Sequence, residues 1–307
     1  QSRVKDGLKK LNSSGSIQGI DLSEIITNPK LELALTDLTI SREGFIFFGT
    51  NRNGLIGYNP GNSVFNKIVA GSNEGELPDF SSVRALAFDK NNLLWVGTSK
   101  GLRVLFGIGP FFETASNPKA QPIIILEEGI PQELLFQQAL TDIKVDGANK
   151  KWVATATSGV FYLSPDGQET IHHFTKKNSP LPSNNVQDIA IDPDSGLVYF
   201  ATLNGLVAFK GSATAPRDNL SAVRAFPNPV RPGFLGNVTI DGLTRNANIK
   251  ITDIEGNLVY ETTSLGGSVL WDTTAFGKYR VASGVYFVLI TGEDAEETKV
   301  AKIMIIR

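Results

Sequence analysis

VRALAFDKNNLLWVGTSKGLRV, residues 83–104, places two short apolar runs around a polar turn, and similar stretches occur elsewhere in the chain. Each copy has an alternating strand, a polar turn, an aromatic-led strand that ends in threonine, a second turn and a third strand. The other copies are LTDLTISREGFIFFGTNRNGLI (35–56), LTDIKVDGANKKWVATATSGVFY (140–162) and VQDIAIDPDSGLVYFATLNGLV (186–207).

The copies recur at a nearly constant spacing. The threonine falls at Thr50, Thr98, Thr155 and Thr202, so successive copies lie 48, 57 and 47 residues apart. The period is therefore about 47 residues with one insertion. Repeats of roughly 40–50 residues with four short strands each are typical of β-propeller blades. We expect an all-β fold in which these copies are blades.

The residue chemistry of each copy favours hairpins over helices. Asn53-Gly54 and Asn204-Gly205 are strong turn signals, because tight hairpin turns need a positive φ that Gly and Asn tolerate. Alternation such as Leu86/Phe88 marks strands with one buried face. The leading aromatic of each copy should pack between blades, so we interpret the repeat as architecture and not as an active site.

The composition excludes several classes of protein. The chain of 307 residues is 41% hydrophobic and 20% charged, as in ordinary globular proteins, and its net charge of −2 offers no field for nucleic acid. It has no cysteine, which excludes disulfides and cysteine-ligated metal sites. No apolar run approaches the roughly 18–20 residues of a transmembrane helix.

The ends of the repeat array favour further blades upstream, although a four-bladed ring closed by the N-terminal strand is an alternative. Residues 4–12, VKDGLKKLN, are similar to the late hairpin of the third copy, SPDGQETIHHF (164–174), and the fourth copy ends after Lys210 without an outer strand. The chain also begins Gln-Ser-Arg with no initiator Met. Because an open arc would leave bare sheet edges, we expect an N-terminally truncated part of a seven-bladed ring.

The composition changes after the fourth copy, at a polar segment that begins with Gly211. We expect blades in residues 1–212, a linker in residues 213–222 and a second domain in residues 223–307. FPNPV (226–230) contains two prolines, which a regular central strand does not accept. Some seven short strands in about 85 residues favour an immunoglobulin-like sandwich.

Two resemblances rest on these segments. The core of each copy, LWVGT…GL at 94–102, resembles the two-component regulator propeller repeat. The terminal module resembles the C-terminal sorting domain of Bacteroidetes type IX secretion substrates. The matching stretches are FPNPV, VTIDGL…NANIKITDIEGNLVYE (238–261), WDTTAFGKYRVASGVYFVLI (271–290) and the final KVAKIMIIR, with Asp272-Thr-Thr where a Gly often follows the Asp.

The sorting-domain resemblance assigns a set of residues to the sorting signal. Its last strand carries lysines between apolar residues, so we expect one charged and one buried face there, and lysines also protect an edge strand from pairing. The residues assigned to the signal are Pro227, Pro229, Gly256, Gly284, Lys299, Lys302 and Arg307.

Residues 120–167 and 172–191 resemble one family in particular, the PorZ family of type IX surface proteins. That resemblance implies two propellers before a retained sorting domain, and a non-enzymatic protein at the cell surface or outer membrane. It also implies partnership with the type IX sortase and outer-membrane secretion components, and binding of anionic lipopolysaccharide for delivery to the sortase. It implies no cofactor.

Three carboxylates recur near the start of the first strand of a copy. Asp37, Asp142 and Asp188 share this position, where the second copy has Ala85. In a propeller the position lies near the mouth of the central channel, where a carboxylate ring could bind a cation or a sugar amine. Hydrogen bonding to neighbouring turns explains the recurrence equally well, because Asp commonly stabilises turns.

The insertion that breaks the period, Phe106 to Leu135, is the best candidate for a binding loop. It contains Phe111, Phe112 and four prolines, and long excursions between strands are often functional. Exposed aromatic rings suit sugars or flat protein surfaces. The insertion could instead cover part of the ring.

Other polar residues give no site. His172 and His173 are adjacent and should point to opposite faces of a strand, so they cannot easily share a metal. Asp192-Pro-Asp-Ser-Gly196 lacks the ligands of a calcium loop and is interpreted as a turn. No common catalytic motif is present, and we expect neither catalytic nor metal-binding residues.

Three other functions remain open at this stage. The protein could be a secreted cargo with a glycan- or protein-binding propeller whose sorting domain is cleaved on export. It could be the sensor of a hybrid histidine kinase, which would have a membrane span and a kinase after the propeller. It could be a propeller hydrolase with paired carboxylates at the channel mouth.

Overall fold

The computed structural model describes residues 8–26, 34–113, 118–127, 129–211 and 213–307. The described chain is built from β-strands and one short 3₁₀ helix, η1 (Pro110–Phe112), which confirms the all-β prediction. It divides into two compact units, which are described separately. One unit is Gln1–Val145, Lys151–Ile189 and Phe200–Val207, and the other is Asp146–Lys150, Ala190–Tyr199 and Ala208–Arg307.

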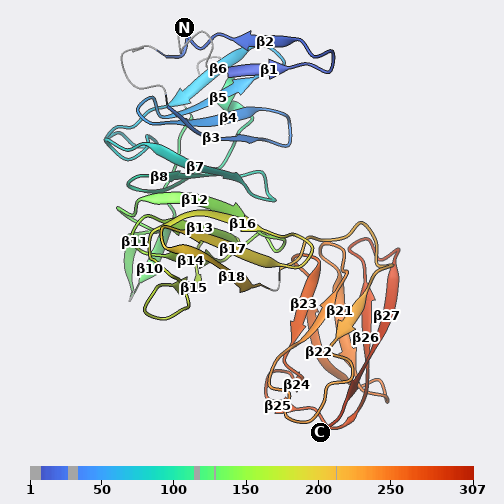
Figure 1. The fold of residues 1–307 in the computed structure, drawn as a ribbon. Coiled ribbons are helices and arrows are strands. Elements are labelled where there is room, and N and C mark those ends of the chain that lie inside the picture. The colour runs from blue at the N-terminus through green and yellow to red at the C-terminus, as the bar shows by residue number, and fades with distance from the viewer. Residues whose placement is uncertain (1–7, 27–33, 114–117, 128, 212) are drawn as a thin grey trace. The chain divides into compact units, whose positions relative to one another are not determined.

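The four sequence copies fold as four antiparallel sheets, here called blades 1 to 4. Figure 1 shows the first strands β3, β7 and β12 one beside the next, and they contact one another in that order. Blade 1 is β3 (Leu35–Ile40), β4 (Ile46–Thr50), β5 (Leu55–Asn59) and β6 (Val64–Ile68), and blade 2 is β7 (Val83–Phe88), β8 (Leu94–Thr98) and β9 (Gly101–Leu105). Blade 3 is β12 (Leu140–Val145), β13 (Lys151–Thr155), β14 (Val160–Leu163) and β15 (Thr170–Phe174), and blade 4 is β16 (Val186–Ile191), β17 (Leu197–Thr202) and β18 (Gly205–Lys210).

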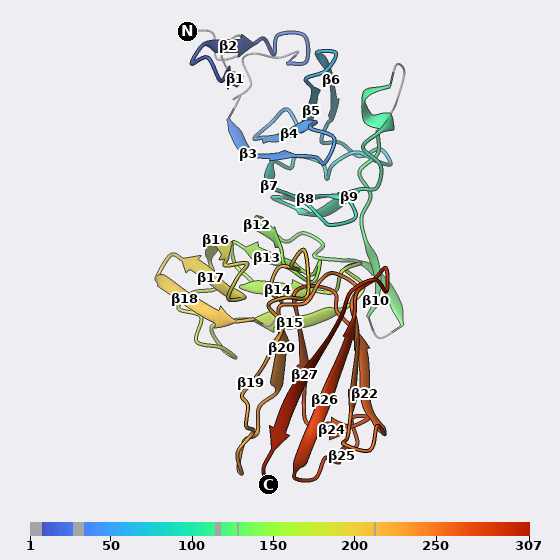
Figure 2. The same ribbon diagram turned by 90° about the vertical axis from the view of Figure 1, so that its right-hand side faces the viewer.

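Two further hairpins accompany the blades. β1 (Leu8–Leu11) pairs with β2 (Ile17–Ile20), as expected for the late hairpin of a preceding copy. The insertion contains β10 (Ile124–Glu127) and β11 (Ile130–Glu133), which are labelled in Figure 1, and β10 is labelled again in Figure 2. Among the described residues blade 2 has three strands, and Gln121 forms a single antiparallel bridge to Val104 at its edge. Closure of a ring stays a prediction.

The recurring threonine closes the second turn of every copy. The hydroxyl of Thr50 donates to the carbonyl of Gly54 at 2.8 Å, and Thr98 donates to Gly101 at 2.7 Å. The third and fourth copies repeat the bond with Thr155–Gly159 at 2.9 Å and Thr202–Gly205 at 2.7 Å. Gly54 needs to be glycine, because its φ is 77° and a Cβ there would lie 2.1 Å from the carbonyl oxygen of Ile68.

Blades 2 and 3 share a fully buried ion pair. Lys151 on β13 places its Nζ 2.9 Å from Oδ2 of Asp89, and neither side chain is exposed to solvent. The ammonium also donates to the carbonyl of Pro165 and lies 4.5 Å from the ring centroid of Trp95, whose indole N–H donates to Asp89. Backbone N–H groups of the turn bind the other carboxylate oxygen, so the buried charges are compensated.

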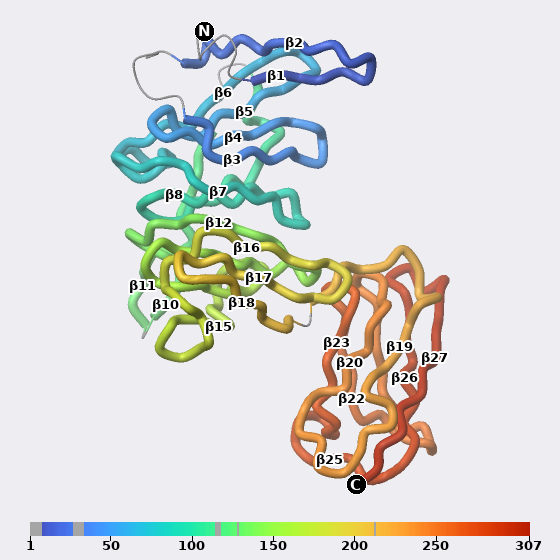
Figure 3. Tube along the Cα trace, viewed as in Figure 1, coloured from blue at the N-terminus to red at the C-terminus, as the bar shows by residue number. Residues whose placement is uncertain are grey.

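The second unit contains the sandwich. One sheet is β19 (Arg224–Phe226), β20 (Val238–Asp241) and β23 (Ser268–Trp271), and the other is β22 (Leu258–Thr263), β21 (Asn248–Thr252), β26 (Gly284–Thr291) and β27 (Thr298–Ile305). A small hairpin, β24 (Thr274–Ala275) and β25 (Tyr279–Arg280), follows β23. Figure 3 follows the trace of these strands to the C-terminus.

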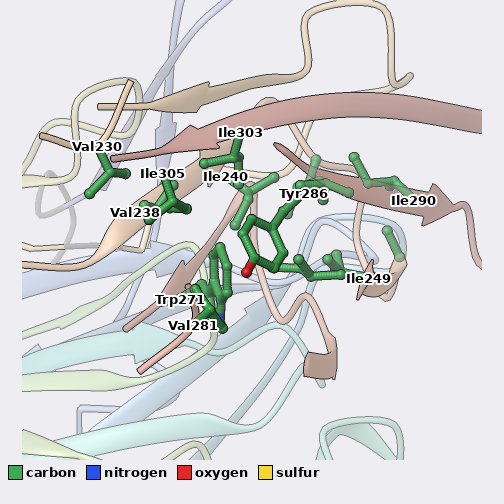
Figure 4. Close-up of a cluster of buried hydrophobic side chains, with 14 of the residues drawn as sticks. Val230, Val238, Ile240, Ile249, Trp271, Val281, Tyr286, Ile290, Ile303 and Ile305 are labelled. Atoms are coloured by element: carbon green, nitrogen blue, oxygen red, sulfur yellow. The ribbon is translucent and has the colours of Figure 1, made fainter. Parts of the chain in front are cut away.

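The sandwich core is one apolar cluster built around two aromatic rings. Figure 4 shows Trp271 and Tyr286 among aliphatic side chains from both sheets, and their ring centroids lie 5.6 Å apart. The polar end of each ring has a partner: the indole N–H of Trp271 donates to the carbonyl of Thr274, and the hydroxyl of Tyr286 bonds to that of Ala282. The immunoglobulin-like prediction for this module is confirmed.

Lys151→Met should lower the free energy of unfolding by about 3–5 kcal/mol, because it leaves the buried carboxylate of Asp89 without its counter-charge. Guanidinium titration followed by circular dichroism measures the change. Lys119→Met is the matched control: Lys119 pairs with Glu74 at the surface, and exposed pairs contribute little. Equal unfolding free energies for Lys151→Met and the native protein would contradict a stabilising role for the pair.

Candidate functional site

Two of the three predicted channel-mouth carboxylates bind backbone of the following blade, whereas the third, Asp188, is exposed and accepts a hydrogen bond from the amide of the adjacent Ile189. Oδ2 of Asp37 accepts a hydrogen bond from the amide of Leu86 at 2.7 Å, and Oδ2 of Asp142 accepts one from the amide of Ile189 at 2.8 Å. Blade 1 is thereby joined to blade 2, and blade 3 to blade 4.

A threonine completes each of these junctions. The hydroxyl of Thr36 donates to the carbonyl of Val83 at 2.7 Å, and that of Thr141 donates to Val186 at 2.6 Å. Each Thr-Asp pair therefore binds one carbonyl and one amide of the next blade, and we call this arrangement the Thr-Asp clasp. Blade 2 has Arg84-Ala85 at this position and has the buried pair of Asp89 with Lys151 at its junction with blade 3.

A lysine forms an ion pair with one of these carboxylates, Asp142. Nζ of Lys144 lies 2.9 Å from Oδ1 of Asp142, and the charges of Asp188 and Asp37 also act on this ammonium. Burial lowers the pKa of Lys144, but Asp142 and the two other carboxylates outweigh that effect and raise it above its usual value. The position predicted to attract an external cation is thus adjacent to an internal one.

Asp142 itself has a shifted pKa. Loss of hydration raises the pKa of this carboxyl to about 6, while the hydrogen bond and charge of Lys144 and the amide of Ile189 oppose the rise. At neutral pH the carboxyl is ionised and the pair with Lys144 is intact. Among the described residues no group of three or more His, Asp or Glu side chains is placed to hold a metal ion.

The two phenylalanines of the predicted binding loop pack against blade 1. Phe111 is fully buried, with its ring centroid 5.0 Å from that of Phe47, and Phe112 lies 4.7 Å from Phe45. The backbone carbonyl of Phe111 accepts a hydrogen bond from Asn66. The expectation that these rings are exposed was wrong, because the short η1 helix turns them onto the apolar face of the blade.

His172 and His173 lie on the outer strand β15 of blade 3, and both are exposed. The ring of His173 stacks on Phe161 with centroids 3.9 Å apart and bonds to the carbonyl of Ser158. The ring of His172 stacks near Tyr162 instead. The two imidazoles therefore have separate neighbours.

The first and last segments of the sandwich lie side by side. Asn228, between the predicted signal residues Pro227 and Pro229, bonds through its side-chain amide to the carbonyl of Lys302 at 2.8 Å and to the amide of Met304 at 3.0 Å. The next apolar residue, Val230, forms a parallel bridge to β27 and buries its side chain in the core. The peptide bonds before both prolines are cis.

The charged residues of the predicted signal have different surroundings. Arg307 donates to the hydroxyl of Thr273 at 2.8 Å and to the carbonyl of Val281, so the C-terminal residue holds the loop after β23. Lys302 lies 5.7 Å from the ring centroid of Phe287 on the outward face. Lys299, opposite Ile290, is also exposed.

The outward face of β27 is mixed, so the expectation of one charged face was wrong. Val300 and Met304 are exposed beside Lys302, because nothing among the described residues of the sandwich covers this side of the sheet. The predicted glycines differ too: Gly256 has φ of 88° in the turn between β21 and β22, whereas Gly284 simply begins β26. Their roles in sorting stay a prediction.

The predicted linker is packed against the sandwich, which its sequence did not predict. Leu220 is fully buried in the sandwich core, and its amide donates to Glu297 at 2.8 Å. The amide of Arg217 donates to the carbonyl of Leu243 at 2.9 Å. The one signal available was the single large apolar residue in the otherwise polar stretch 213–222. The predicted domain boundaries stay a prediction.

Comparison with known families and structures gives matches in both parts of the chain. Residues 224–306 match the secretion system C-terminal sorting domain, and residues 79–100 match the two component regulator propeller repeat. The structure is similar to PorZ, an essential bacterial surface component of the type IX secretion system of Porphyromonas gingivalis. The TM-score is 0.64 at 29% identity, covering 96% of this chain and 41% of PorZ, so the chain spans less than half of that protein.

Other solved structures match with lower scores. The extracellular domain assigned to a hybrid two component system of B. thetaiotaomicron has a TM-score of 0.41 at 13% identity, covering 97% of this chain and 42% of its own. Streptogramin B lyase has a TM-score of 0.38 at 12% identity, covering 90% and 84%. No curated protein sequence matches this chain. Within the part of the chain that the structure describes, no helix is long and apolar enough to cross a membrane.

The pKa of Asp142 should be about 6 in a carboxyl ¹³C NMR titration, with Asp166 as internal reference because a hydrogen bond from Ser164 lowers the pKa of that carboxyl. Lys144→Met should raise the pKa of Asp142 further, since the opposing positive charge is removed. A folded pKa above the unfolded value of 3.8 means that this group's contribution to stability falls as pH rises from about 4 to about 6. Asp142→Asn should remove that slope, and an Asp142 pKa at or below 3.8 would contradict the account.

Proposed function

Because the chain is a PorZ-like protein with a type IX sorting domain at residues 224–306, we propose that it is a non-enzymatic component of the type IX secretion machinery at the cell surface. In this proposal the blades partner the sortase and outer-membrane components, and they bind anionic lipopolysaccharide for delivery to the sortase. The sorting domain stays attached. Similarity to PorZ over nearly the whole chain supports the general role.

The packing of residues 217–223 is the observation that supports retention of the sorting domain. A protease needs an accessible, extended segment, and tolerance to cleavage follows the burial and hydrogen bonding of the backbone. Here Leu220 is inside the sandwich core, and the amides of Arg217 and Leu220 are bonded to other parts of the sandwich. Cleavage in this segment would require Leu220 to leave the core, at a cost of about 1.5–3 kcal/mol for a buried leucine.

The arrangement of the blades supports a scaffolding role over a catalytic one. The recurring carboxylates Asp37 and Asp142 bind backbone amides of the next blade, and Asp142 is paired with Lys144. A glycosidase of the usual kind needs two carboxyl groups free to act on substrate. Two of the three carboxylates that were candidates for that chemistry therefore have structural partners instead.

The protein at the cell surface should retain its C-terminus, so that mass spectrometry of surface-exposed protein identifies peptides through Arg307. Leu220→Asp should expose the segment and produce cleavage within residues 217–223, whereas Ser221→Asp at the adjacent exposed position should not. A native surface form that ends near residue 222 would instead identify a cargo protein.

The proposed partners are tested by two binding measurements. Immobilised protein should capture the purified type IX sortase, and it should bind lipopolysaccharide that carries anionic polysaccharide more tightly than lipopolysaccharide that lacks it. Failure of both measurements with a folded protein would overturn the proposed partners while leaving the fold assignment intact.

A further inference from the structure

Two equivalent loops of the blades differ in length by one residue. Residues Leu77–Ser82 connect blade 1 to blade 2, and residues Leu181–Asn185 connect blade 3 to blade 4. In both loops Leu-Pro begins the segment, and the carbonyl of the last residue accepts a hydrogen bond from the second turn of the following blade, from Ser99 to Ser82 and from Leu203 to Asn185. The first loop is one residue longer.

The longer loop presents Phe80 to solvent. Its side chain is 85% exposed, and its φ is 54°. A left-handed conformation is a genuine outlier for a bulky residue, and such strained residues concentrate at functional sites. The amide of Phe80 donates to Oδ1 of Asp79, and the ammonium of Lys100 lies 5.5 Å from the ring centroid. An exposed aromatic ring is therefore held in a defined and costly position.

Beside this ring lies a hydroxyl group with no hydrogen-bond partner among the residues that the structure describes. It belongs to Ser81, which is only 5% exposed. In the sister loop the equivalent Asn184 is satisfied, because its Oδ1 accepts the amide of Lys176 at 2.7 Å. Nδ2 of Asn53, on the neighbouring turn of blade 1, also lacks a partner within the described part of the chain. Unsatisfied buried polar groups are rare and call for an explanation.

A cavity of about 560 Å³ lies beside Phe80 and Ser81. Ser81, Phe80 and Asp79 line it from the loop, and Asn51 and Arg52 line it from the turn between β4 and β5. The cavity thus combines an exposed aromatic ring with a buried hydroxyl, a carboxylate and a guanidinium. Pockets that bind small molecules characteristically combine apolar surface with a few convergent polar groups.

We propose that this cavity binds a neutral pyranose residue of a glycan. The apolar C–H face of a pyranose matches the face of Phe80, while its hydroxyls can donate to Asp79 and bond with the unpartnered Oγ of Ser81. A flat aromatic ligand would leave Ser81 unsatisfied. The charges of Asp79 and Arg52 cancel, so the lining has no net charge that would favour an acidic sugar. This cavity would be the part of the blades that contacts the lipopolysaccharide glycan, so the inference rests on the proposed function.

Two substitutions test the site, with native protein and a panel of neutral methyl pyranosides as probes. Saturation-transfer NMR should detect at least one bound pyranoside, with amide shifts centred on residues 79–82. Phe80→Gly should weaken that binding at least tenfold and raise the thermal unfolding midpoint, because glycine relieves the left-handed strain. Ser81→Ala should weaken binding about fivefold without lowering the midpoint, since the lost hydroxyl had no partner among the described residues.

Asn184→Ala in the sister loop is the matched control, and it should leave pyranoside binding unchanged. Unchanged binding in both Phe80→Gly and Ser81→Ala, or no binding of any pyranoside to the native protein, would overturn the inference. Lipopolysaccharide binding that persists in Phe80→Gly would also overturn it while the proposed function stands. Pyranoside binding by a protein that binds neither sortase nor lipopolysaccharide would support the site and reject the proposed function.

Discussion

The contacts between the first and last segments of the sandwich also order residues 217–223, which precede its first strand. Asn228 and Val230 bind the backbone of β27, and Leu220 packs into the same core. The first and last parts of the module are therefore stabilised together, since the apolar cluster around Trp271 includes residues from both. A domain that is removed by a protease would need an accessible linker before it. Here residues 217–223, which would have to be that linker, are part of the folded sandwich.

The blades depend on polar contacts at each junction as well as on apolar packing. Thr-Asp clasps join blade 1 to blade 2 and blade 3 to blade 4, and the buried pair of Asp89 with Lys151 lies between blades 2 and 3. Such contacts need both partners in a fixed register, because an unpaired buried carboxylate or amide is costly. The loop that carries Phe80 leads into Val83, whose carbonyl is bound by Thr36 of the preceding blade.

Much of the fold follows from local pattern, whereas the site depends on contacts distant in sequence. The recurring Thr98 and the alternation around Trp95 identify the hairpins, because both act within one copy. The hydrogen bond that Asp37 accepts could not be predicted from the pattern within one copy, because its donor, the amide of Leu86, lies 49 residues further on. Lys151 looks like a surface lysine beside Lys150, and Leu220 lies in a polar stretch, so only tertiary packing reveals that both are buried.

Amide hydrogen exchange of the native protein shows whether residues 217–223 belong to the folded sandwich. The amide of Leu220 should be protected with a free energy of opening close to that of Val288 in β26, because both exchange only when the core opens. If Leu220 exchanged at the rate of an unstructured peptide while Val288 stayed protected, these residues would not be part of the sandwich.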